Sequence, residues 1–129
     1  MKYRIFHTNF GFQLECEGDM AAQDTKAMIE EFSKQVKIIH RDYCIIADFS
    51  EVSALSPEAE DVLREAIKFS NNNGLMRASI IYSDSYFKDF YEDAVHSSTF
   101  QKKYYFINAE KNPNWDNEAI DWVENGFVS

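Results

Sequence analysis

Two short apolar runs constrain the fold of this 129-residue chain more than any other feature. Residues 43–49 (YCIIADF) and 77–82 (RASIIY) contain few polar side chains, unlike a strand that has one face in water. Such runs are typical of strands that are covered on both faces in a parallel sheet. Polar residues and then an apolar stripe with helical spacing follow each run. The sequence therefore predicts an α/β fold in which residues 43–49 form a central strand.

The remaining segments complete this pattern. In FQLECE, residues 12–17, apolar and polar side chains alternate with the period of a strand, and NFG joins this segment to KYRIFHT in a predicted hairpin. Helices are predicted between residues 20 and 39, from Ser56 to the NNNG run, within 83–95, and from Asp116 to Gly126, and a last strand within 102–108. The order ββαβαβαβα predicts one domain over residues 1–129, with a single mixed five-stranded sheet, a leading antiparallel hairpin and four helices.

Helix termini give the clearest local signals. Ser56 is suited to cap the second helix, Pro57 fits its first position, and Glu58 lies where the helix dipole favours a negative charge. Asp116 is expected to cap the last helix, with Trp115 packed on Ile120 as a hydrophobic staple. The predicted buried side of that helix consists of Ala119, Ile120, Trp122 and Val123.

Composition excludes several classes of function. The net charge of −9 repels nucleic acid and anionic lipid, and no apolar run is long enough to cross a membrane. The first residues do not resemble a signal peptide, so we expect a cytoplasmic protein. Cys16 and Cys44 are predicted to be buried thiols, and the three histidines have no zinc-binding spacing. We expect no metal, no cofactor and no catalytic residues, and hence no enzyme.

The segment DFSEVSALSPEAEDVLREAI, residues 48–67, resembles the strand–loop–helix segment of STAS domains, the anti-sigma-factor antagonist family. The hairpin before it, ASIIYS after it and the closing YYFINAE and NEAIDWV are similar to the SpoIIAA-like branch. The resemblance implies a STAS (SpoIIAA-like) fold. In sporulation-type members the helix begins with a serine that is phosphorylated, within an Asp-Ser-Ser-Gly motif, and this motif falls on residues 56–59 here. Glu58 takes the place of the acceptor, so the resemblance implies a module without the usual phosphoacceptor serine.

The carboxyl ends of parallel strands meet at one sheet edge, where ligands bind in open α/β folds. We expect a polar pocket or partner-docking rim at this edge, formed by Asp48, Ser50, Ser53, Ser56, Asp84 and Ser85. Glu58 is a further candidate for binding a ligand or partner. The competing interpretation is that these side chains only cap helices and satisfy loop amides.

Nine aromatic residues lie between Tyr82 and Phe106, more than one core face needs. Strand alternation is expected to send only one of the pairs Tyr104/Phe106 and Tyr105/Ile107 to the core. The surplus rings are predicted to form a contact surface or a cavity wall centred on Tyr86, Phe90, Tyr91, Phe100, Tyr104 and Tyr105. A thick aromatic core with tyrosine hydroxyls at the surface is the alternative.

These observations support two hypotheses on function. The first is a non-enzymatic regulatory or protein-interaction module of the STAS kind, which binds a protein partner or self-associates as a homodimer. The second is a domain that binds a small apolar or anionic ligand in an aromatic-lined cavity. An enclosed cavity beneath residues 85–106 would favour the ligand-binding domain, whereas a packed interior with an exposed apolar patch would favour the interaction module.

Overall fold

The computed structural model describes residues 1–96 and 101–128, and its elements follow the predicted order. The strands are β1 (Lys2–His7), β2 (Gly11–Met20), β3 (Tyr43–Leu55), β4 (Leu75–Tyr82) and β5 (Tyr104–Asn108). The helices are α1 (Ala22–Ile39), α2 (Pro57–Asn72), α3 (Ser85–His96) and α4 (Trp115–Asn125), and a short 3-10 turn, η1 (Gln101–Lys103), precedes β5.

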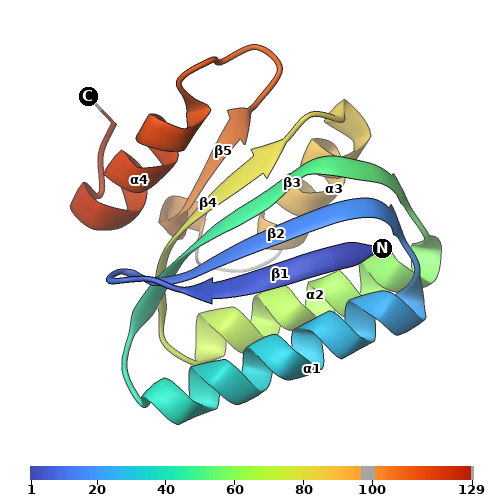
Figure 1. The fold of residues 1–129 in the computed structure, drawn as a ribbon, viewed down its shortest axis with the longest axis horizontal. Helices are drawn as coiled ribbons and strands as arrows, with labels where there is room; N and C mark the ends of the chain where they lie inside the picture. The colour runs from blue at the N-terminus through green and yellow to red at the C-terminus, as the bar shows by residue number, and fades with distance from the viewer. Residues whose placement is uncertain (97–100, 129) are drawn as a thin grey trace.

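The five strands form one mixed sheet in the order β1-β2-β3-β4-β5, so β3 is central as predicted (Figure 1). β1 and β2 are antiparallel, and every other neighbouring pair is parallel because a helix connects its strands. At the hairpin between β1 and β2, Thr8 and Gly11 exchange backbone hydrogen bonds. Gly11 has φ 142°, and a Cβ there would collide with the Cys44 carbonyl, so this position requires glycine.

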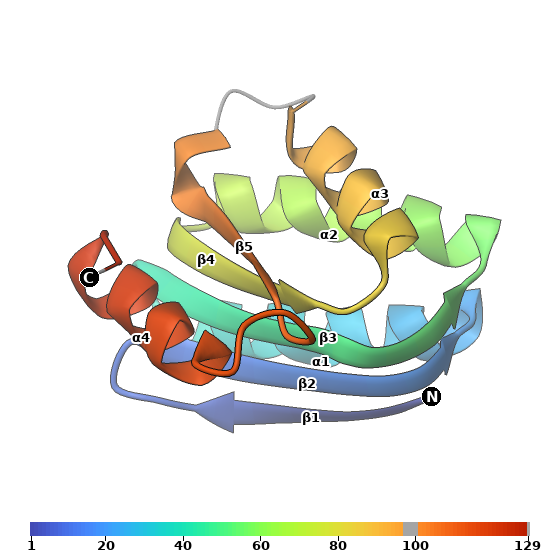
Figure 2. The ribbon, with the colours of Figure 1, turned by 90° about the horizontal axis from the view of Figure 1, so that it is seen from above.

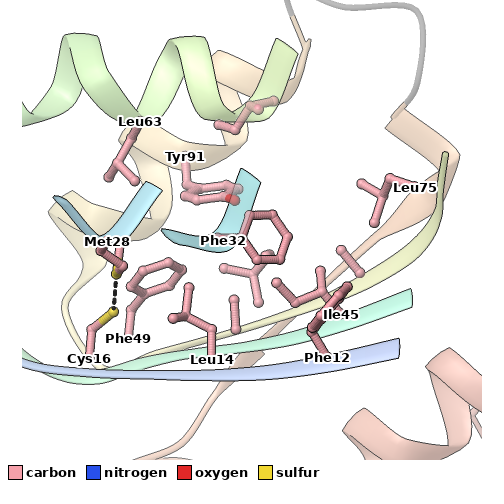
Figure 3. Close-up of a cluster of buried hydrophobic side chains, with 14 of the residues drawn as sticks. Phe12, Leu14, Cys16, Met28, Phe32, Ile45, Phe49, Leu63, Leu75 and Tyr91 are labelled. Atoms are coloured by element: carbon pink, nitrogen blue, oxygen red, sulfur yellow. Dashed lines mark hydrogen bonds between the residues drawn. The ribbon is translucent and has the colours of Figure 1, made fainter. Parts of the chain in front are cut away.

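Helices cover the two faces of the sheet unequally (Figures 1 and 2). α1, α2 and α3 lie on one face and enclose the large core (Figure 3). In this core Phe12 packs edge-on against Phe32 and Tyr43. α4 lies on the other face and packs on β3, β4 and β5 over a smaller core that includes Ile46 and Val123. Burying each large apolar side chain contributes about 1.5–3 kcal/mol, so the large core dominates stability.

Both cysteines are free and buried, as predicted. Cys16 faces the large core and its Sγ lies 3.2 Å from the Sδ of Met28, whereas Cys44 lies in the smaller core under α4. Burial raises the pKa of the Cys16 thiol to about 12, with the Asp48 charge adding to the rise. The thiol is therefore protonated at neutral pH.

The predicted loop after residue 49 is a strand instead. β3 continues to Leu55, which pairs with Met20 at the end of β2. The register between the two strands shifts near Glu15 and Glu17, so β3 bulges and then resumes pairing. Ser50 and Ser53 suggest a loop because this part of β3 is half exposed and lacks the apolar run of a buried strand. Its pairing partner in β2 also lies far away in sequence: Leu55 pairs with Met20, 35 residues earlier.

Two expectations about the last helix are wrong. α4 begins at Trp115, before the proposed cap Asp116, because the Asn112 side chain accepts from the Asn114 amide and its carbonyl accepts from the Trp115 amide. Ile120 is 42% exposed, so it does not belong to the buried side of α4, to which the sequence assigned it.

The prediction that β5 sends only one alternating pair inward is also wrong, because helices cover both faces of this strand. Tyr104 and Phe106 pack on the large core. Ile107 is buried in the smaller core under α4, and Tyr105 packs against it.

Candidate functional site

The start of α2 is built as the sequence predicts. Ser56 has extended backbone, and its Oγ accepts a hydrogen bond from the Ala59 amide at 3.1 Å. Pro57 occupies the first helical turn, where its missing amide hydrogen is not needed. The Ser56 amide donates to the Met20 carbonyl at 3.1 Å, which fixes the entry into α2 against the end of β2.

The start of α3 lies against the start of α2. The Tyr86 hydroxyl donates to Oε1 of Glu60 at 2.7 Å, although the two residues are 26 apart in sequence. Asp84 accepts from the Tyr86 amide at 3.2 Å and so orients the first turn of α3, which begins at Ser85. Acceptance by the Glu60 carboxylate raises the pKa of Tyr86, so the phenol stays neutral and can donate.

We call residues 56–61 of α2 together with residues 84–86 the acidic rim. Glu58, Asp61, Asp84 and Tyr86 are exposed within it, and Tyr86 is 59% exposed. One cation lies next to the rim: Arg64 pairs with Asp61 at 2.8 Å and stacks over the Phe90 ring at 5.1 Å. The rim thus presents carboxylates and one exposed ring to solvent.

Asp48 and Ser50 do not join this rim. Oδ1 of Asp48 accepts from the Ser50 amide at 2.9 Å and from the Ser50 hydroxyl at 2.6 Å, at the bulge of β3. Asp48 lines an open cleft of about 640 Å³ that also includes Arg4 and Glu15, which pair at 3.1 Å. This cleft lies over β1, β2 and β3, to which Arg4, Glu15 and Asp48 belong. Because β3 runs on from Asp48 to Leu55, Asp48 and Ser50 do not lie beside Ser56, and the predicted gathering of all six polar residues at one edge is wrong. Exposed Ser53 lies between the two groups along β3.

The surplus aromatic residues are mostly covered. Phe90 and Tyr91 are each only 8% exposed, and Phe87 stacks on Phe49 with ring centroids 4.7 Å apart. Tyr105 is half-buried beneath α4: its hydroxyl donates to Glu118 at 2.9 Å. Phe100 lies outside the described residues. Among the predicted contact rings that are described, Tyr86 is the one that is exposed.

The interior cavity is small. It measures about 40 Å³ and lies between the sheet and α1, α2 and α3, with Tyr91 and Tyr104 in its wall. Pockets for organic ligands usually measure roughly 300–1,000 Å³, so this space does not accommodate a lipid or a metabolite of that size.

Within residues 1–96 and 101–128, no three His, Cys, Asp or Glu side chains lie close enough together to hold a metal ion. None of the described helices is long and apolar enough to cross a membrane.

Sequence reasoning missed Glu60 and Asn71. Glu60 accepts the hydrogen bond of Tyr86, a role that no local pattern around it indicates. Asn71 was interpreted as part of a helix stop, but it is a buried residue of α2 whose Oδ1 accepts from the Tyr104 hydroxyl at 2.9 Å. Its position, four residues after the inward-facing Ile67, was the available signal.

The mixed sheet with three helices on one face and one on the other is the SpoIIAA-like fold. An uncharacterised protein of the DUF3478 family from Shewanella loihica PV-4, described as having a SpoIIAA-like fold, superposes with a TM-score of 0.65 at 17% identity, over 95% of this chain and 92% of its own. The anti-sigma factor antagonist SpoIIAA, in its unphosphorylated form, superposes with a TM-score of 0.61 at 11% identity, over 99% of this chain and 100% of its own. No protein-family model and no curated protein sequence matches the chain.

Proposed function

We propose that this chain is a non-enzymatic protein-interaction module of the STAS kind, and that it binds its partner through the acidic rim. The observation that carries the proposal is the hydrogen bond between Tyr86 and Glu60, which joins the first turns of two helices into one exposed surface. The likeness in fold to an anti-sigma factor antagonist, a protein that acts on another protein, supports the same class of function.

Glu58 gives the rim a fixed charge. It lies exposed in the first turn of α2, where the helix dipole favours a carboxylate, at the position that the STAS resemblance assigns to the phosphoacceptor. A carboxylate cannot be phosphorylated or dephosphorylated as a serine can. The module is therefore held in one charge state, and its binding is regulated through the amount of partner instead of a kinase.

The charge of the rim defines the chemistry of the partner. The whole chain carries −9, and Glu58, Asp61 and Asp84 are exposed on the rim. A complementary surface offers Lys or Arg side chains and a hydrogen-bond acceptor or apolar contact for Tyr86. Charge pairs at the margin of an interface mainly raise the association rate, so binding weakens as salt is added.

A photo-crosslinking side chain, p-benzoylphenylalanine, tests this surface. Placed at Ser85, an exposed rim residue beside Tyr86, in the cells that make the protein, it leaves the Tyr86–Glu60 hydrogen bond in place and should give a defined adduct with one partner. Placed at Ile38, which is 72% exposed near the end of α1, it should not, because that end lies beside the end of α2 and not its start.

Charge variants of the rim show whether the crosslinked adduct reflects specific binding of the partner or only random collision. Glu58→Gln with Glu60→Gln should reduce the adduct at position 85, whereas Glu65→Gln, which removes a charge from an exposed site farther along α2, should not. Adducts of equal yield at positions 38 and 85, or an adduct that is insensitive to the rim charges, would show that the rim is not the binding surface.

A further inference from the structure

The face of the sheet that carries α4 is only partly covered (Figure 2). α4 packs on β3, β4 and β5, whereas the other described helices lie on the opposite face. Strand pairing aligns side chains across the uncovered part of this face, which we call the bare strip. Its rows are Phe6–Gln13, Arg4–Glu15–Asp48 and Lys2–Glu17–Glu51, on the same face as Ile46 of the smaller core.

Exposed apolar side chains border the bare strip. Polar rows alone would be an ordinary solvated sheet face, but Phe6 on the edge strand β1 is 44% exposed. On the other side, Ile120 of α4 is also exposed. Ala119 of α4 faces the sheet, and Glu118 lies on the flank of the helix that accepts the hydrogen bond from Tyr105 of β5. Ile120 comes directly after Ala119, so it lies on the opposite flank, toward β2.

The bare strip is about as wide as one helix. Neighbouring strands are roughly 4.8 Å apart and a helix with its side chains is about 10 Å across, so β1 and β2 leave room for one helix beside α4. The open cleft of about 640 Å³ that includes Arg4, Glu15 and Asp48 lies over the strip. A helix is the usual cover for a sheet face in α/β folds, and α4 covers the other part of this face in that way.

The bare strip carries negative charge that the chain does not neutralise. Its two cations, on β1, are each paired with a glutamate of β2, at 3.1 and 3.9 Å. Asp48 and Glu51 on β3 form no ion pair within the described residues. A cationic partner is attracted to these carboxylates, whereas a second copy of this chain, with a net charge of −9, is repelled.

We propose that the bare strip binds a basic amphipathic helix of a partner protein, which lies on the sheet beside α4. The apolar side chains of this helix pack on Phe6 and Ile120, and its Lys or Arg side chains pair with Asp48 and Glu51. The strip lies on the opposite face of the sheet from α2 and α3, whose first turns form the acidic rim, so it is a second binding surface.

A synthetic peptide of roughly 18 residues, with leucine on one helical face and lysine on the other, tests this surface. Titrated into the isotope-labelled full chain, it should bind saturably, become helical by circular dichroism, and shift the amide resonances of Arg4, Gln13 and Asp48. Two control peptides should not bind: one of the same composition in scrambled order, which has no apolar face, and one with glutamate in place of every lysine.

Variants of the chain identify the contacts. Phe6→Ser with Ile120→Ser should weaken binding of the lysine peptide about ten-fold, because both apolar contacts are lost. Ile38→Ser is the matched control, since it removes an exposed apolar side chain from α1 on the other face of the sheet and should leave the Kd unchanged. Glu51→Gln should also weaken binding, whereas Glu30→Gln, at an exposed position of α1, should not.

Three results would overturn the proposal: no saturable binding of the lysine peptide, equal binding of the scrambled peptide, or amide shifts centred on residues 56–61 and 84–86. The last result would place the peptide on the acidic rim instead of the bare strip. The crosslink at position 85 concerns the rim alone, so the two binding surfaces succeed or fail independently.

Discussion

At the scale of single residues, the cap of α2 is the most specific prediction. Ser56→Ala removes the bond to the Ala59 amide and should lower the free energy of unfolding by about 1 kcal/mol. Ser53→Ala is the control: Ser53 is exposed on β3 without a side-chain hydrogen bond in the described structure, so its loss should change stability by less than about 0.5 kcal/mol. Urea unfolding of both variants measures the difference, and equal losses would contradict the assigned cap.

Glu58 allows a second test at this scale. A serine kinase of the partner-switching type should place no phosphate on residues 53–60 of the wild-type chain, whereas Glu58→Ser restores a hydroxyl at the acceptor position and should be labelled. Phosphopeptide mass spectrometry measures the phosphorylation of the wild-type chain and of the Glu58→Ser variant. Stoichiometric labelling of Ser53 or Ser56 in the wild type would contradict a fixed charge state.

At the scale of elements, side chains of β4 hold α4 on the sheet. Nη2 of Arg77 donates to the Val123 carbonyl at 2.9 Å, and the Ser79 hydroxyl donates to the Ala119 carbonyl at 2.9 Å. Arg77→Ala should cost roughly 1.5–3 kcal/mol, the range for hydrogen bonds from charged groups, and speed hydrogen exchange at residues 119–126. Arg41→Ala, at an exposed arginine without an ion pair in the described chain, should do neither. Unchanged protection in α4 would show that apolar packing alone holds it.

At the scale of the whole molecule, net charge opposes folding. With 22 acidic and 13 basic residues, the folded chain repels itself, and added salt screens this repulsion. Exposed pairs such as Lys68 with Glu65 are weakened by salt as well, but each contributes little. The melting temperature should therefore rise with sodium chloride, by about 4 °C for each kcal/mol gained. A falling melting temperature would mean that the ion pairs outweigh the repulsion.

The sheet edges and the covered rings also bear on self-association. The homodimer was expected from exposed aromatic residues, but Phe90 and Tyr91 are buried and Tyr105 is bonded beneath α4. Edge strand β1 carries exposed Lys2 and Arg4, which disfavour strand pairing with a second copy. Self-association therefore stays a prediction, to be measured by sedimentation.

The sequence by itself determined the elements and their order, because these depend on short-range chemistry. The alternation of Phe12, Leu14 and Cys16, the apolar run of β3 and the Ser56–Pro57 start of α2 all involve neighbours within one element. Backbone periodicity and helix capping involve only a few neighbouring residues, so they can be recognised in the sequence without knowledge of the tertiary contacts.

Only the tertiary structure decided which residues meet across elements. The continuation of β3 depends on β2 as a pairing partner, and the bonds of Tyr86 with Glu60 and of Tyr104 with Asn71 span 26 and 33 residues. Residue type cannot reveal such contacts, since a tyrosine or asparagine suits a turn, a surface or a core equally well until packing fixes its neighbours. The acidic rim exists because the fold brings the starts of α2 and α3 together, which no local pattern encodes.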